Sequence, residues 1–330
     1  MRIQHKHKEQ PETLKSLAQR HATGDMDALE ENQIVVEAIE AKTILTRNPN
    51  PALGHYWSIN PYRGCQFGCT YCFARYTATF IEVNDPMEFE RRIFYKQNAP
   101  ELVRHLRDRD FHGRPVALGT ATDPWQPVEG KLQITRGILD GLQRYPSLDL
   151  FCLTKSSLIR RDADLLGQLV REGRHVAVGF SITTLDAGLS KKMEPQAALP
   201  QERLKAMRLL ADAGVEVGLM AMPVVPLLTD SEDQLDALFA AARAHGARFV
   251  YGGALHLRKD PKRRFLPWID SEFPHLAREF HKVYDYAAHH TEAYRAEVHA
   301  RVDALRIKHG FPGRTDRFHR RGEQLSLFGD

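Results

Sequence analysis

Short apolar runs alternate with longer amphipathic segments over much of this chain. Each apolar run is bounded by turn residues and is short enough to be a strand. Five such strands are expected in the middle of the chain, at residues 115–123, 148–154, 175–183, 215–222 and 247–253. Segments with a helical period separate them, at residues 132–145, 162–172, 201–213 and 231–244. Strands that alternate with helices in this way indicate βαβ units and a parallel sheet.

The region before residue 115 adds further elements to this pattern. Residues 55–60 are expected to form the first strand of the parallel sheet, and residues 41–46 alternate enough to form another strand. A helical stretch is expected from about residue 87 to residue 109. In parallel α/β sheets and barrels the functional side chains lie at the C-terminal ends of the strands, so each strand end is a candidate site.

Three of the four cysteines fall within eight positions, directly after the strand expected at residues 55–60. They are Cys65, Cys69 and Cys72, in the spacing Cys-x3-Cys-x2-Cys. Three closely spaced thiolates can hold three irons of a [4Fe–4S] cube and leave the fourth iron open. Gly64 and Gly68 let the backbone approach a cluster closely, because neither has a side chain. The alternatives are a zinc site, which normally needs a fourth Cys or His, and a disulfide, which would leave one thiol over.

This cysteine run, with Tyr71 just before its last cysteine, resembles the signature of the radical S-adenosylmethionine (SAM) superfamily. Within that superfamily the chain resembles the spore photoproduct lyase-like group. The resemblance implies an α/β fold, a partial (β/α)6 TIM-like barrel with an N-terminal arm and a C-terminal helical extension. It also implies that the cysteines hold a [4Fe–4S] cluster whose open iron is chelated by SAM. One electron from the reduced cluster would then cleave SAM to a 5′-deoxyadenosyl radical, which abstracts hydrogen from a substrate.

The resemblance to the lyase-like group also assigns residues to SAM. Leu153-Thr154-Lys155 matches a strand-three motif whose lysine contacts SAM, and Phe180-Ser181-Ile182-Thr183 matches a strand-four motif whose serine does. Met193-Glu194-Pro195 matches the Glu-Pro element that follows, and Tyr71 matches a tyrosine beside the cluster. The cofactor-binding residues expected on this basis are Tyr71, Thr122, Lys155, Ser181 and Glu194. The alternative for the Thr and Ser residues is that they end strands and cap the helices that follow.

Two positions depart from the pattern of the photoproduct lyases. Those enzymes place a hydrogen-donating cysteine at the end of strand two, where this chain has Thr120, and a tyrosine after the last cluster cysteine, where it has Phe73. A threonine O–H bond is far too strong to donate a hydrogen atom as a thiol does. We therefore do not expect reversal of a spore-type thymine dimer. Cys152 does not substitute, because strand side chains alternate and an inward Lys155 leaves Cys152 facing the helices as a small buried hydrophobe.

The barrel pattern ends near residue 256, where a basic segment begins. Residues 256–265 contain five basic residues and one acid. The basic residues are Arg258, Lys259, Lys262, Arg263 and Arg264. Because this segment follows the last strand, it should lie near the active-site face and could bind nucleic-acid phosphates. The alternative is a solvated basic loop. Two helices are expected after it, at residues 274–287 and 290–308.

The last part of the chain contains a second signal. Residues 310–313 break the preceding helix, and a basic tail follows that ends in an apolar Leu-Ser-Leu-Phe. Apolar anchors on a polar terminus indicate a peptide-docking motif. This one resembles the pentapeptide by which bacterial polymerases and repair proteins dock on the replicative sliding clamp, with Gln324, Leu325, Leu327 and Phe328 as its contact residues. The alternative is a tail that folds back onto the barrel or has no role.

Composition places limits on this picture. With 330 residues, 42% hydrophobic and 27% charged, the chain can bury a full core. The N-terminus has no apolar signal region and no run reaches membrane-spanning length, so we expect a cytoplasmic protein with no membrane partner. A reducing compartment agrees with thiolate ligands. The net charge of +4 does not by itself establish a nucleic-acid partner.

The chain is therefore expected to have four parts and one principal function. The parts are an N-terminal arm (1–50), the partial barrel (51–255), the basic loop with C-terminal helices (256–309) and the tail (310–330). We expect a radical SAM enzyme that repairs or modifies DNA and receives electrons from an external donor, with DNA and the sliding clamp as possible partners. The alternatives are a radical SAM enzyme acting on RNA or a peptide, and an iron–sulfur redox or scaffold protein that does not cleave SAM. Lys155 and Ser181 argue against the last, because an electron carrier does not need them.

Overall fold

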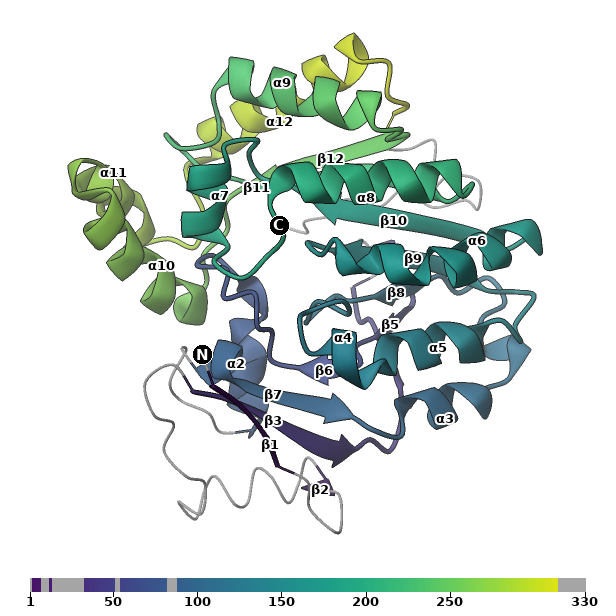
Figure 1. Cartoon of the computed structure of the whole chain (residues 1–330). Helices are drawn as coiled ribbons and strands as arrows, with labels where there is room; N and C mark the ends of the chain where they lie inside the picture. The colour runs from purple at the N-terminus through teal and green to yellow at the C-terminus, as the bar shows by residue number, and fades with distance from the viewer. Residues whose placement is uncertain (1, 7–11, 14–32, 51–53, 82–87, 314–330) are drawn as a thin grey trace.

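A large, mostly parallel sheet forms the centre of the molecule (Figure 1). The computed structural model describes residues 2–6, 12–13, 33–50, 54–81 and 88–313. Within these residues the large sheet has the strand order β12-β11-β10-β9-β8-β5-β4. The strands are β4 (Leu45–Arg47), β5 (Trp57–Ile59), β8 (Val116–Leu118), β9 (Asp149–Thr154), β10 (His175–Ser181), β11 (Glu216–Val224) and β12 (Phe249–Ala254). Neighbouring strands are parallel except β4, which is antiparallel to β5. The expected α/β class and its six parallel strands are confirmed.

Helices cover the outer face of this sheet (Figure 1). They are α4 (Glu129–Leu132), α5 (Ile134–Leu142), α6 (Ala163–Arg171), α8 (Pro200–Asp212), α9 (Glu232–Ala244) and α12 (Glu292–Lys308). Alternation along β9 separates the two faces: Leu150 and Cys152 join the main core under the helices, whereas Phe151 and Leu153 join a separate inner cluster with Phe249. Cys152 therefore points outward, as predicted, and burial raises the pKa of its thiol.

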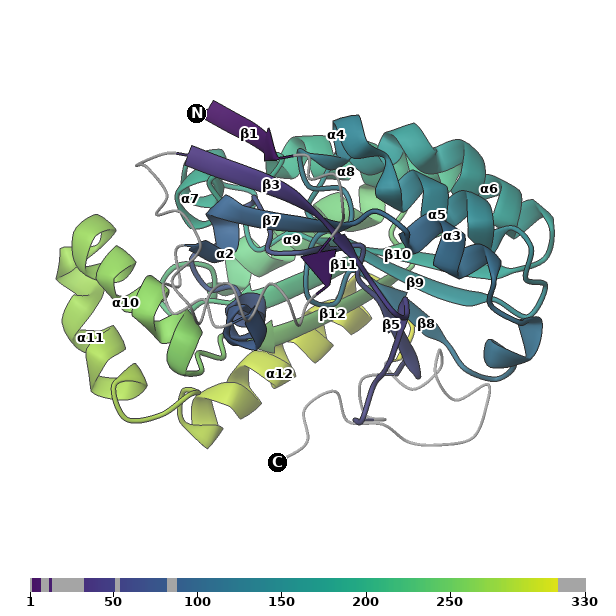
Figure 2. The same cartoon turned by 90° about the horizontal axis from the view of Figure 1, so that it is seen from below.

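A second, smaller sheet lies beside the first (Figures 1 and 2). Its strands are β1 (Arg2–Lys6), β2 (Glu12–Thr13), β3 (Gln33–Glu40), β6 (Tyr62–Arg63) and β7 (Arg92–Lys96). The order is β1-β3-β7-β6, with β2 also paired to β3. Residues 33–40, expected to belong to an arm, thus form the strand at which this sheet is centred. One face, with Ile93 and Tyr95, joins the main core, and the other, with Ile39 and Phe94, joins an apolar cluster that includes Cys65.

The prediction of a continuous helix at residues 87–109 is wrong. The described residues of that stretch form α2 (Glu88–Arg91), β7, α3 (Ala99–Arg104) and a 3-10 turn, η3 (Asp108–Asp110). All five residues of β7 are buried, and their run of isoleucine, phenylalanine and tyrosine suits a strand between two others. Pro100 lies in the first turn of α3, where proline favours a new helix start.

Helices also complete the C-terminal part of the described chain. The prediction of a basic loop is wrong beyond its first residues. Helix α10 (Lys259–Glu272) begins at Lys259 and is followed by α11 (Pro274–Tyr284). Phe265, Trp268 and Phe280 are buried between these helices and pack ring against ring. The two later helices were expected at nearly the bounds observed for α11 and α12. Every helix among the described residues is too short or too polar to span a membrane.

Candidate functional site

The cysteine loop, residues 64–72, connects β6 to the 3-10 helix η2 (Phe73–Ile81). Its cysteines are free thiols, of which Cys65 and Cys69 are buried and Cys72 is partly exposed. Burial, with smaller contributions from Asp123 and Cys72, raises the pKa of Cys65 to about 12. Burial also raises the pKa of Cys69 well above its usual value, and both other loop cysteines add to that effect. The thiols of Cys65 and Cys72 therefore lie close to the thiol of Cys69.

These thiols fit the cluster expected from the sequence. The buried thiols of Cys65 and Cys69, whose pKa values are raised, stay protonated until metal binding displaces their protons. Among the described residues, no three His, Cys, Asp or Glu side chains converge on one point as the ligands of a single ion do. A cluster requires less convergence, because each thiolate binds a different iron. The donor set and its loop are thus suited to a [4Fe–4S] cluster held by Cys65, Cys69 and Cys72.

Close backbone packing holds the start of the cysteine loop against the α2–β7 junction. Gly64 has a φ of +77°, and a Cβ there would lie 2.8 Å from the Phe89 carbonyl oxygen and closer still to that of Arg92. The Cys65 amide donates to the same Phe89 carbonyl (3.0 Å). Only glycine satisfies both the backbone conformation and the contact. The glycine predicted to allow close approach is needed here for the protein's own packing.

Arg75 and Glu90 support the middle of the loop. Arg75 donates from Nη2 to the Cys69 carbonyl (3.0 Å) and to Glu90 Oε2 (2.5 Å). Gly68 lies against the same carboxylate, since a Cβ there would be 3.2 Å from Glu90 Oε2. The Arg75 side chain is fully buried, so its hydrogen bond to the Cys69 carbonyl holds the loop backbone from the interior of the protein. Neither residue was predicted for the site, because Glu90 lies in a stretch expected to be an ordinary helix and no element was expected at Arg75.

Glu194, which directly follows α7 (Ala187–Met193), ties the loop to the larger sheet. Its carboxylate accepts the Tyr71 hydroxyl and forms an ion pair with Arg203. Burial would raise its pKa, but Arg203 and Lys155 outweigh burial and hold the pKa of Glu194 below its usual value. Arg203 also donates to the Ser181 carbonyl (2.7 Å), at the end of β10. Both Glu194 oxygens thus have protein partners, and a role toward SAM stays a prediction.

Lys155 brings a positive charge to the cysteine loop from the end of β9. Its Nζ lies 5.7 Å from the centroid of the Tyr71 ring. Burial lowers the lysine pKa, but Cys69 and Glu194 reverse that effect and the pKa is raised overall. The ammonium group therefore stays protonated beside the thiols. Lys155 and Tyr71, predicted to share the site, are brought together by the fold.

Asp123 fixes the strand ends that carry these groups. It accepts the Lys155 amide at Oδ2 (2.7 Å) and the Thr154 hydroxyl at Oδ1 (2.8 Å). Burial raises its pKa despite these hydrogen bonds. Thr122, one residue earlier, donates its hydroxyl to the Gly64 carbonyl (2.6 Å). The ends of β8 and β9 are thus bonded to each other and to the cysteine loop.

Two threonine hydroxyls near the loop are buried without a hydrogen-bond partner in the described structure. They are Thr70 Oγ1, within the loop, and Thr183 Oγ1, two residues beyond Ser181. Buried hydroxyls are rarely left unpaired. Thr183 is therefore a further candidate to contact a bound molecule, which residue type alone did not distinguish from a helix cap.

The basic residues of α10 begin just after β12, on the side of the sheet where the cysteine loop lies. Arg264 Nη2 is 3.9 Å from Glu90 Oε1, so it reaches the carboxylate that supports the loop. Arg258, Lys259 and Arg263 are exposed, and Lys262 is partly exposed. Arg258 donates from Nε to His256 Nε2 (3.3 Å). The structure thus places one of the five cations against the loop support and presents most of the others to solvent.

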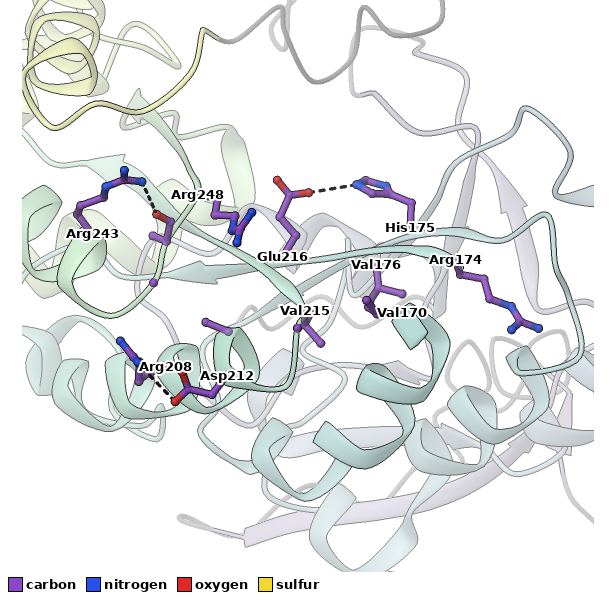
Figure 3. Close-up of a pocket in the computed structure, with 14 residues that line it drawn as sticks. Val170, Arg174, His175, Val176, Arg208, Asp212, Val215, Glu216, Arg243 and Arg248 are labelled. Carbon is purple, nitrogen blue, oxygen red and sulfur yellow. Dashed lines mark hydrogen bonds and ion pairs between the residues drawn. The ribbon is translucent and has the colours of Figure 1, made fainter. Parts of the chain in front are cut away.

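A cavity of about 780 Å³ lies at the opposite ends of the strands (Figure 3). It is bordered by the starts of β10, β11 and β12, with His175 paired to Glu216 and Arg208 paired to Asp212. Chemistry in parallel α/β folds occurs at the C-terminal strand ends, where the cysteine loop is. We therefore place the functional site at the loop and not in this cavity. The tail residues Gln324, Leu325, Leu327 and Phe328 lie outside the described residues.

The chain is similar in sequence to known proteins. The radical SAM superfamily model matches residues 59–239. An uncharacterised protein of Mycobacterium tuberculosis is 33% identical over 282 residues, covering 85% of this chain and 82% of that protein. An uncharacterised protein of Methanocaldococcus jannaschii is 28% identical over 239 residues, covering 72% of this chain and 85% of that protein.

Solved structures of spore photoproduct lyase share the fold. The lyase complexed with dinucleoside spore photoproduct matches with a TM-score of 0.64 and 14% identity, over 91% of this chain and 92% of that chain. A double mutant of the lyase with bound AdoMet and dinucleoside spore photoproduct matches with a TM-score of 0.62 and 14% identity, over the same shares of the two chains. At this identity the likeness establishes the fold and not the reaction.

Proposed function

Because this chain belongs to the radical SAM superfamily, we propose that it cleaves SAM reductively and acts in the repair or modification of DNA. The superfamily implies a [4Fe–4S] cluster and SAM, and the chain is a radical SAM enzyme whose specific reaction is open. We assign the cluster to Cys65, Cys69 and Cys72. With SAM bound, such a cluster supplies the electron that breaks the C–S bond and yields a 5′-deoxyadenosyl radical.

One observation supports this proposal above the others: a protonated Lys155 lies beside the free thiols of the cysteine loop. An ammonium group in that place suits the carboxylate of SAM, through a charge-assisted hydrogen bond. Ser181, at the neighbouring strand end, is held by the Arg203 contact to its carbonyl, and we propose that its hydroxyl contacts SAM. Tyr71 connects the cysteine loop to Glu194 through its hydroxyl, and Thr122 positions the loop backbone through its hydrogen bond to Gly64.

The DNA half of the proposal depends on α10 and on the fold. Exposed cations at the start of α10 stand next to the C-terminal end of β12, where a phosphate backbone could cross the site. The lyase that shares this fold is described in complex with a dinucleoside spore photoproduct. A lyase-type reaction is not part of the proposal, because Thr120 replaces the donor cysteine and its hydroxyl accepts a hydrogen bond from Asn60 (3.1 Å).

The first experiment measures 5′-deoxyadenosine from the anaerobically reconstituted, dithionite-reduced protein with SAM, with and without ultraviolet-damaged DNA. Product that rises with DNA supports both halves of the proposal. Product that is indifferent to DNA keeps the enzyme and favours RNA or a peptide as substrate. If the protein has an intact cluster but forms no 5′-deoxyadenosine, the result favours the alternative of a redox or scaffold protein.

DNA binding can be tested separately from turnover. Exchanging Lys259 and Arg263 together for glutamine should weaken DNA binding and reduce the slope of log K against log salt by about two. Lys282→Gln, an exposed lysine on α11, is the matched control and should leave the slope unchanged. Equal slopes in all three proteins would contradict the assignment of α10 to DNA.

The tail is tested by a pulldown with the sliding clamp. Loss of clamp capture in the Leu327→Ala, Phe328→Ala double variant would support the tail as a docking motif, and unchanged capture would count against it.

A further inference from the structure

Two cations share one face of the smaller sheet. Arg63 in β6 is paired in register with Phe94 in β7, and the Lys96 amide donates to the Pro61 carbonyl (3.0 Å). Because Phe94 and Lys96 are two residues apart on one strand, the side chains of Arg63 and Lys96 project from the same face. They are diagonal neighbours across an antiparallel pair, within reach of each other for long side chains.

Neither cation has a carboxylate partner in the described structure. Lys96 is 8% exposed, and no hydrogen bond or ion pair involves its Nζ among the described residues. Arg63 Nε is buried and has no hydrogen-bond partner there. Burial of a charge without a counter-charge is strongly unfavourable, and two like charges together are worse. The pKa of Lys96 is accordingly lowered to about 8, by burial first and by Arg63 second.

The other charged groups on this face do not neutralise the pair. Arg92, on the same face of β7, forms its own ion pair with Glu88 (2.8 Å). Glu37 of β3 faces Phe94 in register and has interactions of its own. It is not among the groups that shift the Lys96 pKa. Among the described residues, the fold therefore places an arginine and a lysine on one sheet face without a carboxylate paired to either.

We propose that Arg63 and Lys96 form a binding site for a phosphate-type oxyanion, separate from the SAM-binding residues. A planar guanidinium and an ammonium group together bind such an anion through charge-assisted hydrogen bonds. Arg63 lies two residues before Cys65, so an anion bound there would stabilise the strand that leads into the cysteine loop. The anion is either a free ion or a phosphate of a nucleic-acid backbone, and the chemistry is the same for both. This site does not depend on DNA being the substrate.

The test uses the cluster-loaded, full-length protein under anaerobic conditions, without SAM. Potassium phosphate should raise the midpoint of thermal unfolding in a saturable way, relative to potassium chloride at the same ionic strength. Lys96→Met should abolish that rise. It should also unfold at an equal or higher midpoint than the wild type in chloride, because an unpaired buried charge has been removed. A merely structural lysine would instead lower the midpoint in both salts.

Two further variants control this experiment. Lys42→Met removes an exposed lysine next to Ala41, which is hydrogen-bonded to Asn98 just beyond β7, and should leave the phosphate effect unchanged. Lys96→Arg keeps the charge and should retain a phosphate effect. Calorimetric titration of phosphate in the presence of a short oligonucleotide separates the two sources of the anion. If the oligonucleotide competes with phosphate, the site binds a backbone phosphate; if it does not compete, the site binds a free ion. No phosphate effect in the wild type, or an equal effect in Lys96→Met, would overturn the proposal.

Discussion

Glu194 and Arg203 form an ion pair whose side chains are 0% and 1% exposed. The pair does more than join α8 to the segment after α7, because Glu194 also accepts the Tyr71 hydroxyl and Arg203 also donates to the Ser181 carbonyl. One buried carboxylate thus links the cysteine loop to the ends of the strands. This link and the Thr122 contact to the Gly64 carbonyl together hold the loop beside the strand ends.

Arg203→Met should therefore both destabilise the fold and disturb the cluster site. Removing one partner of a buried pair leaves an uncompensated charge and costs about 3–5 kcal/mol of unfolding free energy. Chemical denaturation measures this loss, and iron bound per chain after reconstitution should fall with it. Arg208→Met is the matched control on the same helix, because its pair with Asp212 is more than half exposed and should contribute at most about 1 kcal/mol. Equal losses in the two variants would contradict the anchoring role.

Gly64→Ala should prevent normal assembly of the cysteine loop. The new Cβ would press on the carbonyl oxygens of Phe89 and Arg92, and alanine at a φ of +77° adds about 1–2 kcal/mol of backbone strain. Gly113→Ala separates the two effects, since Gly113 has a φ of +64° but nothing lies within 4 Å of its Cβ position. We expect the Gly113 variant to lose only the strain energy and to bind iron normally. Iron content and the unfolding midpoint measure both; normal iron binding by Gly64→Ala would refute the steric argument.

The parallel sheet could be predicted because its strands and helices have distinct periods in sequence. Strands such as β9 alternate between a buried face and a partly buried face, so even the outward position of Cys152 followed from the sequence. The smaller sheet could not be predicted in the same way. Its strand β7 is five residues long and lies between two short helices, so its local pattern reads as helix. Only its pairing with β3, more than fifty residues earlier, makes it a strand.

The parts of the site that could be predicted are those whose residue type and spacing indicate a particular chemistry. Ordinary charged residues whose partners are distant in the sequence could not be predicted. The cysteines are recognisable by spacing, and Lys155 and Tyr71 meet as expected. Arg203 reads as a surface residue of an amphipathic helix, because nothing local reveals that Glu194 will lie against it. Arg75 and Glu90 are hidden for the same reason, since their pairing exists only after the loop has folded.

Lys155→Met should weaken SAM binding without loss of iron. If the ammonium group binds the SAM carboxylate, its removal costs about 1.5–3 kcal/mol, a rise in Kd of about 10- to 100-fold. Equilibrium binding of SAM to the anaerobic, cluster-loaded protein measures the change. Lys155→Arg should recover part of the affinity, and Lys191→Met, an exposed lysine on α7, should have no effect. Unchanged SAM affinity in Lys155→Met would show that this charge serves the thiols alone.

The lowered pKa of Lys96 predicts how stability depends on pH when no phosphate is present. The folded protein releases this proton near pH 8, whereas the unfolded chain keeps it until about pH 10.5. Between these values the unfolded state binds more protons, so the unfolding free energy rises with pH. Below pH 8 the destabilising effect of the charged lysine is fully present. Burial also lowers the pKa of Arg63, the charged group that faces Lys96, and a lowered pKa of a cation changes the unfolding free energy in the same direction.

The measurement is the difference in unfolding free energy between the wild type and Lys96→Met in chloride buffers from pH 7 to pH 10.5. Other titrating groups are common to both proteins and cancel. The wild type should gain about 3 kcal/mol relative to the variant across this window, because one pKa unit corresponds to about 1.4 kcal/mol. Saturating phosphate should reduce the gain, since a bound anion restores the lysine's proton affinity in the folded state. A flat difference would mean that Lys96 is solvated or paired, and would remove the basis for an anion site.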